Sequence, residues 1–295
     1  MLRWLLVATL AWTAILAGGL LIASQESGQP DWTLVVLGIA QDGGVPHLGC
    51  NEGACAAARE GKRRVEKVAS MGVINRRTGQ AYVFDATPDF PAQVHALTGG
   101  RTPDGIFVTH AHIGHYTGLM YLGRESIGAR DVPVYGTARM AAYLRGNGPW
   151  SLLVQNGNIS LRTLEPGRAV ELAPGLRVTA FVVPHRDEFT DTVGYRIQGP
   201  RATALYVPDT DRWETWQTSI RELADSADLA LLDGTFASPA EVKGRDISEI
   251  PHPMMSVTRD LLRGVRARVR FIHVNHTNPE LDAPDVVREG WEFEL

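Results

Sequence analysis

The sequence is poor in cysteine and has no block of charge of one sign. Its 295 residues include only Cys50 and Cys55, too few for a disulfide-stapled scaffold. Lys and Arg never run beyond the three residues at 62–64 and the net charge is −4, so no basic nucleic-acid-binding patch is expected. With 44% hydrophobic and 21% charged residues, the composition excludes collagen-like, coiled-coil and disordered chains and leaves an ordinary globular protein.

An apolar run from Trp4 to Ala23 lies near the N-terminus, follows Arg3 and is about long enough to span a bilayer. Residues 1–24 are therefore predicted to be a signal peptide or an uncleaved membrane anchor. No cysteine follows this run, which argues against a lipoprotein. Residues 25–32 are expected to be a linker. Residues 33–295 are expected to be one exported domain, periplasmic or secreted, and held at the inner membrane if the anchor is kept.

Short apolar runs of strand length alternate with amphipathic stretches in the rest of the chain. Strands come first and are then mixed with helices, which favours two packed sheets with outer helices over a doubly wound sheet. Strands are expected at 33–40, 71–75, 81–84, 105–109, 132–135, 176–183, 193–198, 202–207, 229–232 and 269–274. Helices are expected at 117–127, 137–145, 212–226, 256–265 and 285–288.

Five of the expected strands lead directly into a histidine or an aspartate. These residues are His110, His185, Asp209, Asp233 and His273. The ends of adjacent core strands can converge on one point, and imidazole and carboxylate groups together bind a borderline divalent ion such as zinc. The sequence therefore predicts a metal site at one edge of the sheets.

Three histidines lie within six residues after the strand at 105–109. His110 and His112 are two positions apart, so in an extended segment both imidazoles point to the same side and can face one ion. His115 follows a turn at Gly114 and can face a second ion nearby.

Several motifs resemble those of the metallo-β-lactamase superfamily. The segment THAHIGHYTGL at 109–119 resembles the HxHxDH motif of that superfamily, and FDATP at 84–88 resembles the element that precedes it. Later elements of the superfamily are resembled by VPH at 183–185, VGYR at 193–196, PDT at 208–210, DGTF at 233–236 and FIH at 271–273. Of these, VPH and VGYR are closest to the tRNase Z and phosphodiesterase-like branches. GCNEGAC at 49–55, the Arg124-Glu125 pair and HVNHTNP at 273–279 are similar to the coenzyme PQQ synthesis protein B family.

The resemblance implies an α/β fold, namely an αββα four-layer sandwich of two mixed β-sheets flanked by helices. It also implies a metal site holding one or two zinc ions, with manganese or iron as alternatives. Carried over by position, His110, His112 and His185 would hold the first ion, Asp209 would bridge, and His115 and His273 would hold the second.

The implied activity is hydrolysis of an ester, lactone or phosphodiester in a small-molecule substrate, by attack of metal-bound hydroxide. Asp209 would take part in catalysis, and His252 matches a region where tRNase Z-like enzymes carry a histidine acting as general acid. Two alternatives stay open. One is a metal-dependent, iron-binding oxygenase or accessory protein similar to PQQ synthesis protein B, and the other is a degenerate, non-catalytic binder.

The chain departs from the superfamily motif at Gly114, where the motif has an aspartate. Glycine supplies no oxygen, so a second site loses one charge and one ligand. A weaker second ion at Asp209, His115 and His273 and a single ion at the first site both agree with the sequence.

Other polar residues near these motifs have supporting or competing roles. Asp85 and Asp233 are expected to support the ligands or the local structure. His276 could replace His273 or orient it. Asp187 and Glu188 fit solvated loop charges better than groups that orient an imidazole.

The two cysteines lie close together in the chain. The short loop between Cys50 and Cys55 permits a disulfide, which an exported protein can form, and we expect this disulfide. The alternative is half of a structural zinc site completed with His47.

Overall fold

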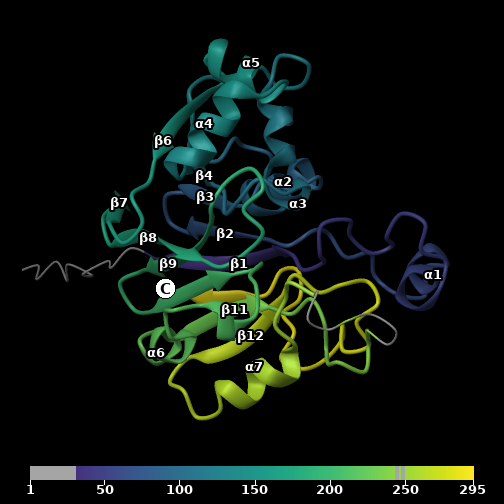
Figure 1. Cartoon of the computed structure of the whole chain (residues 1–295). Coiled ribbons are helices and arrows are strands. Elements are labelled where there is room, and N and C mark those ends of the chain that lie inside the picture. Colours follow the sequence, from purple (N-terminus) through teal and green to yellow (C-terminus); the bar gives the residue numbers. More distant parts are fainter. Residues whose placement is uncertain (1–30, 243–245, 247–249) are drawn as a thin grey trace, which may run out of the picture.

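The computed structural model describes residues 31–242, 246 and 250–295 (Figure 1). The expected signal peptide or anchor at 1–24 and the linker residues 25–30 lie outside the described residues. The expected linker boundary is wrong by one residue, because Trp32 begins the first strand and its side chain is buried in the core. None of the described helices is both long and apolar enough to cross a membrane.

The first sheet has seven strands in the order β13-β1-β2-β3-β4-β5-β6. It is mixed, because β13, β1, β2 and β3 pair antiparallel whereas β3 to β6 pair parallel. Its strands are β1 (Trp32–Gly38), β2 (Ser70–Asn75), β3 (Ala81–Phe84), β4 (Gly105–Phe107), β5 (Val132–Gly136), β6 (Ile159–Thr163) and β13 (Glu292–Glu294).

The second sheet has six strands in the order β12-β11-β10-β9-β8-β7. It is also mixed, with parallel pairing from β10 to β12 and antiparallel pairing from β7 to β10. Its strands are β7 (Ala169–Ala173), β8 (Leu176–Val183), β9 (Thr192–Gln198), β10 (Thr203–Val207), β11 (Leu229–Asp233) and β12 (Arg268–Ile272).

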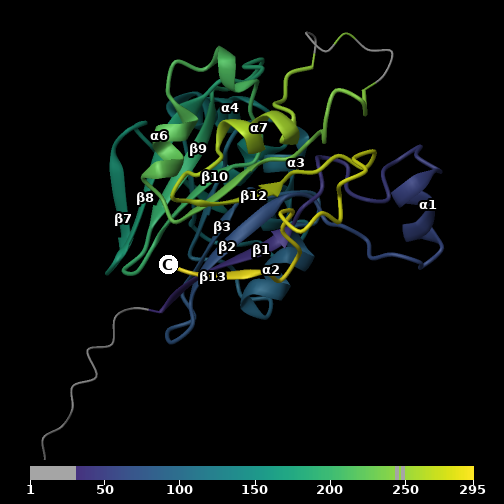
Figure 2. The ribbon, with the colours of Figure 1, turned by 90° about the horizontal axis from the view of Figure 1, so that it is seen from below.

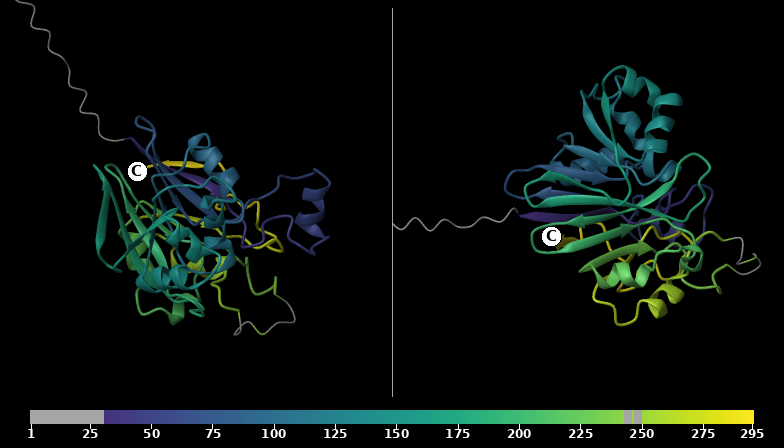
Figure 3. Two further views of the ribbon diagram at one scale, coloured as in Figure 1. Left: turned by 90° about the horizontal axis from the view of Figure 1, so that it is seen from above. Right: turned by 60° about the vertical axis from the view of Figure 1, so that its left-hand side comes forward.

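Helices cover the outer faces of both sheets (Figures 1 and 3). The first sheet is covered by α2 (Phe90–Thr98), α3 (Ile113–Tyr116), η1 (Thr117–Leu122), α4 (Ala138–Gly146) and α5 (Trp150–Gln155). The second is covered by η2 (Trp213–Thr215), α6 (Ile220–Asp225) and α7 (Met255–Leu261). The remaining helix, α1 (Gly53–Arg59), lies on an arm that projects to one side of the sandwich (Figure 2).

The alternation of side chains along β1 explains why its sequence is apolar apart from Thr33. Leu34 and Val36 join the core between the two sheets, whereas Val35 and Leu37 join the core under the helices. Because both faces of the strand are covered, no polar residue interrupts the run from Leu34 to Leu37. The predicted αββα sandwich of two mixed sheets is confirmed.

Several of the elements that differ from the predictions have short or weakly apolar sequences. The strands β6, β7 and β13 are not predicted; all three lie at sheet edges and bury fewer side chains than the central strands. The helix expected at 285–288 is not formed, and the one expected at 212–226 is divided into η2 and α6. The division occurs where Ser219 Oγ accepts a hydrogen bond from Glu222 N at 3.2 Å and so begins α6.

Strand direction decides where the polar strand ends meet. In the first sheet β1, β3 and β4 run in one direction, and in the second β8, β10, β11 and β12 do the same. Their carboxyl ends therefore lie at a common edge of each sheet. The polar residues that end or follow these strands are Asp42, Asp85, His110, His185, Asp209, Asp233 and His273.

Candidate metal centre

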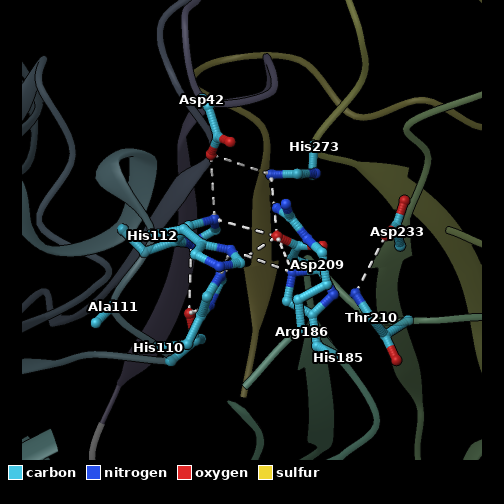
Figure 4. A network of polar contacts seen from close by, with 12 residues as sticks. Asp42, His110, Ala111, His112, His185, Arg186, Asp209, Thr210, Asp233 and His273 are labelled. Atoms are coloured by element: carbon cyan, nitrogen blue, oxygen red, sulfur yellow. Dashed lines mark hydrogen bonds and ion pairs between the residues drawn. The ribbon is translucent and has the colours of Figure 1, made fainter. Parts of the chain in front are cut away.

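Four side chains from the two sheets converge at this edge (Figure 4). We call His110, His112, His185 and Asp209 the first cluster; each offers a ligand atom, and these atoms lie within 4.8 Å of one another. His112 Nδ1 lies 2.9 Å from His110 Nε2 and 3.2 Å from His185 Nε2. Asp209 Oδ2 lies 3.3 Å from His110 Nε2 and 3.2 Å from His185 Nε2. The first cluster thus combines three imidazoles and one carboxylate.

A second cluster lies directly beside the first. It consists of Asp42, His115 and His273, whose ligand atoms also lie within 4.8 Å of one another. Asp42 Oδ1 lies 3.5 Å from His115 Nε2 and 3.7 Å from His273 Nε2. The same two nitrogens lie 3.7 Å and 3.9 Å from Asp209 Oδ2, so one oxygen of Asp209 faces both clusters. Asp42 was not predicted as a ligand from the sequence.

The three atoms of the second cluster that could bind a metal are buried and have no hydrogen-bond partners. Asp42 Oδ1, His115 Nε2 and His273 Nε2 are all in this state. An unsatisfied buried polar group costs about 1–3 kcal/mol, and a cation among the three atoms would remove that cost. Imidazole nitrogen and carboxylate oxygen are donors for zinc, iron and manganese. The residues of both clusters therefore fit a divalent metal.

Asp85 fixes the orientation of His115 from behind. Asp85 Oδ2 lies 2.9 Å from His115 Nδ1, which leaves His115 Nε2 facing the second cluster. The hydroxyls of Thr109 and Tyr206 also donate hydrogen bonds to the Asp85 carboxylate, at 2.9 Å and 3.2 Å. Thr109 Oγ1 in turn lies 3.0 Å from His110 Nδ1. Asp85 thus lies where it can support ligands of both clusters.

Two of these residues have unusual backbone conformations. Asp85 has φ 67° and His273 has φ 62°, in the left-handed region that residues other than glycine rarely adopt. Both residues are fully buried, and His273 Nδ1 lies 3.1 Å from Thr235 Oγ1. Such conformations cluster at functional sites, where the surrounding structure holds them in place.

Glu188 orients His112 at the outer side of the first cluster. Its Oε2 accepts a hydrogen bond from His112 Nε2 at 2.9 Å, which leaves His112 Nδ1 facing the other imidazoles. The expectation that Glu188 is only a solvated loop charge is therefore wrong. The loop after β8 brings the carboxylate to the histidine, although 76 positions separate them in the chain.

His252 lies next to both clusters and is held by Asp233. His252 Nδ1 donates to Asp233 Oδ2 at 2.8 Å and lies 3.5 Å from Asp209 Oδ1. Its ring centroid is 5.9 Å from that of His185. Burial lowers the pKa of His252, but the Asp233 carboxylate outweighs this effect and the pKa is raised above its usual value. Asp233 thus orients His252 and leaves its Nε2 available for another contact.

Two members of the first cluster, His110 and Asp209, have protonation states that suit metal binding, whereas the Asp209 and Asp211 carboxylates outweigh the effect of burial and raise the pKa of His185 to about 10. Burial lowers the pKa of His110 well below its usual value, and the neighbouring His115 lowers it further. Burial alone would raise the pKa of Asp209, but His185 and His273 outweigh this effect and hold it well below its usual value. A neutral imidazole and an ionised carboxylate are the forms that bind a metal.

Comparison with known proteins agrees with this architecture. Residues 80–275 match the family model described as "Beta-lactamase superfamily domain", about two thirds of the chain. The chain belongs to the beta-lactamase superfamily. Asp42 lies before the matched segment, and the ligands of the first cluster lie within it.

Relatives within the superfamily cover most of the chain. Coenzyme PQQ synthesis protein B of Methylobacillus flagellatus is 30% identical over 281 residues, which are 83% of this chain and 90% of that protein. Zinc-bound PqqB from Methylobacterium extorquens has a TM-score of 0.75 at 22% identity and covers 89% of this chain and 100% of its own. A diphosphatase from the PhnP family has a TM-score of 0.68 at 22% identity, covering 90% and 97%. The resemblance predicted from the motifs is therefore confirmed.

His276 belongs to neither the first nor the second cluster. Its ring stacks on that of His47 with the centroids 4.3 Å apart, and it lines a cavity of about 830 Å³ beside the α1 arm. The expectation that it could replace His273 is wrong, because β12 ends immediately before His273 and His276 lies three residues further along the next loop.

The predicted disulfide is also absent, since Cys50 and Cys55 are both free thiols. Cys55 is buried, and its Sγ accepts a hydrogen bond from His47 N at 3.3 Å; Cys50 Sγ instead faces Glu52 O at 3.7 Å. Burial, followed by the neighbouring Cys50, raises the pKa of Cys55. The alternative of a structural zinc site is not supported either, because none of the His, Cys, Asp and Glu groups that could hold an ion in residues 31–242, 246 and 250–295 includes a cysteine.

Proposed function

We propose that this protein is an exported metal-dependent hydrolase that cleaves an ester, lactone or phosphodiester bond in a small-molecule substrate. The observation that carries the proposal is the first cluster, in which three imidazoles and a carboxylate from both sheets lie within ligand distance of one another. Export is part of the proposal and rests on the apolar run at 4–23.

The chain would hold a zinc, manganese or iron ion with His110, His112, His185 and Asp209. Such an ion supplies Lewis acidity and lowers the pKa of a water molecule toward ~7. Asp209 Oδ2 faces both clusters and is positioned to orient the nucleophile between them. Glu188 and Asp85 keep the outer nitrogens of His112 and His115 occupied, so the inner nitrogens stay directed at the centre.

His252 is the residue best placed to supply a proton to the leaving group. Asp233 occupies its Nδ1, so Nε2 is the nitrogen that can donate. The hydrogen bond to Asp233 also stabilises the protonated ring when it forms. The role proposed for His252 is therefore general acid through Nε2.

Replacing His252 by alanine is expected to lower kcat by about 10²–10⁴-fold for substrates with a poor leaving group. The loss should be much smaller for nitrophenyl substrates, because nitrophenolate leaves without protonation. Steady-state kinetics on matched pairs of substrates measure this difference, and bound metal should stay at the wild-type level. An equal loss on good and poor leaving groups would contradict the general-acid role.

Two exposed apolar residues directly follow His112 and its hydrogen-bond partner Glu188 in the chain and suggest the substrate class. Ile113 follows His112 and is 62% exposed, and Phe189 follows Glu188 and is 56% exposed. The Phe189 ring also lies 5.6 Å from that of Tyr143. Exposed apolar groups next to a polar centre favour a substrate with an apolar group near the bond that is cleaved.

The proposal is tested by metal analysis of protein purified without added ions, combined with a hydrolysis assay. The substrate panel pairs short-chain and aromatic esters, lactones and phosphodiesters, each with the apo protein and with zinc, manganese or iron restored. We expect bound metal and turnover that depends on it, higher for the substrates with apolar groups. Protein that binds less than about 0.2 equivalents under all these conditions would exclude a metallo-hydrolase.

A second candidate function follows from the relatives. Similarity to coenzyme PQQ synthesis protein B extends over more than four fifths of the chain, which favours a metal-dependent oxygenase or accessory protein related to that pathway. This candidate predicts iron binding and oxygen consumption with a tyrosine-like or quinone-like substrate. An oxygen electrode alongside the hydrolysis assay separates the two, because zinc-only occupancy with esterase turnover excludes the oxygenase.

A further inference from the structure

Gly114 and Asp42 compete for the same space in the second cluster. A β-carbon added at Gly114 would lie 2.2 Å from Asp42 Oδ1 and 2.9 Å from Asp42 Cα. Both distances are below any normal contact, and the second involves backbone. Any side chain at position 114 therefore excludes Asp42 from its present place.

We propose that Asp42 is the carboxylate ligand of a second metal ion and replaces the aspartate that the superfamily motif has at position 114. The proposal rests on the metal binding in the proposed function and not on the reaction. The first cluster would hold one ion. The second ion would lie among Asp42, His115, His273 and the shared oxygen of Asp209.

The backbone around Asp42 is anchored beside His273. Gln41 N donates to Val274 O at 2.9 Å, and Val274 N donates to Ile39 O at 2.7 Å, so the two segments are paired next to the cluster. Gly44 N donates to Gln41 O at 2.9 Å and closes a turn with Asp42 at its second position. Gly44 has φ +72°, which glycine adopts without strain. The turn therefore holds the carboxylate in place before any ion binds.

The side chains agree with a ligand role. Asp42 Oδ1, His115 Nε2 and His273 Nε2 face one another, and each lacks a hydrogen-bond partner, although both histidines are fully buried. Hydrogen bonds to Asp85 and Thr235 occupy the other nitrogens of the two histidines. Three aimed and unsatisfied donor atoms are the arrangement expected of a site built for a cation.

Charge also favours Asp42 as a ligand. Without it, the two adjacent ions would share a single carboxylate, Asp209, because the other ligands are imidazoles. Two divalent ions in a buried site repel each other strongly, and a second carboxylate reduces that repulsion. Asp42 thus restores the charge that glycine at position 114 removes.

The test is zinc binding by the Asp42→Asn variant, which keeps the side-chain volume and removes the charge. Wild-type protein is expected to bind about two zinc equivalents after dialysis, and the variant about one. Calorimetric titration of metal-free protein should show the second site weakened at least about 100-fold, the upper end of what loss of a supporting group costs. The absorption spectrum of the cobalt-substituted protein should lose the component of one site.

Two further variants make the result specific. Asp282→Asn removes the same charge from an exposed carboxylate that pairs with Arg63 and Arg288, and it should bind zinc like the wild type. The double variant Asp42→Gly, Gly114→Asp places a carboxylate at the position of the superfamily motif and is expected to regain the second ion. Circular dichroism of the metal-free proteins checks the fold.

The proposal is overturned if Asp42→Asn keeps two zinc sites with affinities within about threefold of the wild type, or if the wild type binds one ion only. These measurements use zinc and cobalt without substrate. A protein that binds two ions through Asp42 but hydrolyses nothing would refute the proposed function and leave this inference standing. A protein that hydrolyses its substrate with a single bound ion would support the proposed function and refute this inference.

Discussion

Replacing Asp209 by asparagine is expected to remove metal from both clusters and to lower kcat/KM by at least about 10³-fold, which is about 4 kcal/mol of transition-state stabilisation. The reason is geometric, since Asp209 Oδ2 lies 3.2–3.9 Å from four imidazole nitrogens. The substitution leaves those histidines around an uncharged amide in a buried site. Elemental analysis of the dialysed protein and steady-state kinetics measure the two losses.

Asp211→Asn is the matched control for this experiment. Asp211 is two residues further along and lies 3.7 Å from the outer nitrogen of His185, so it faces the first cluster only indirectly. Its loss is expected to weaken metal binding by roughly 10-fold, the size found for groups that orient a ligand. Equal losses in the Asp209 and Asp211 variants would contradict a central position for Asp209.

Removing the metal is expected to lower the melting temperature by about 8–16 °C. An ion present at about 1,000 times its Kd stabilises the folded state by about 4 kcal/mol, and each kcal/mol shifts the midpoint of a domain of this size by about 2–4 °C. The metal-free form also leaves Asp42 Oδ1, His115 Nε2 and His273 Nε2 buried without partners. Calorimetry after dialysis against a chelator, followed by addition of zinc, measures the shift.

The Asp209→Asn variant is the control for metal removal, because a chelator should leave its melting temperature unchanged. A wild-type midpoint that does not move on chelation or on re-addition of zinc would show that the clusters hold no stabilising ion. A fall that zinc does not reverse would indicate unfolding for another reason.

The centre of the fold could be predicted from the sequence because its strands are covered on both faces. The run at 33–40 has no polar residue after Thr33, and it corresponds to β1. The edge strands gave no such signal, since β13 reads Glu-Phe-Glu and none of the five residues of β7 is buried. The helix α2 was also missed. It contains Pro91, a residue that disfavours the interior of a helix, but Pro91 lies in the first turn, where its lack of an N–H costs nothing.

The histidines of the candidate site could be predicted because each follows an apolar strand or lies in a recognisable motif. Asp42 could not, because its neighbours Gln41, Gly43 and Gly44 read as a turn. The missing aspartate at Gly114 was the available signal, since it implied a lost carboxylate. What replaced that carboxylate depends on β1 and β12 ending side by side, although more than 200 residues separate them in the sequence.

The distribution of the ligands between the two sheets has a consequence for evolution and for protein engineering. His110, His112 and Asp42 follow strands of one sheet, whereas His185, Asp209 and His273 follow strands of the other. The spacing between the ligands therefore depends on how far apart the two sheets pack. That distance is set by contacts between the sheets, such as Phe84 against Tyr195, whose ring centroids lie 5.3 Å apart. Substitutions in this remote interior can retune the choice of ion while every coordinating residue stays the same.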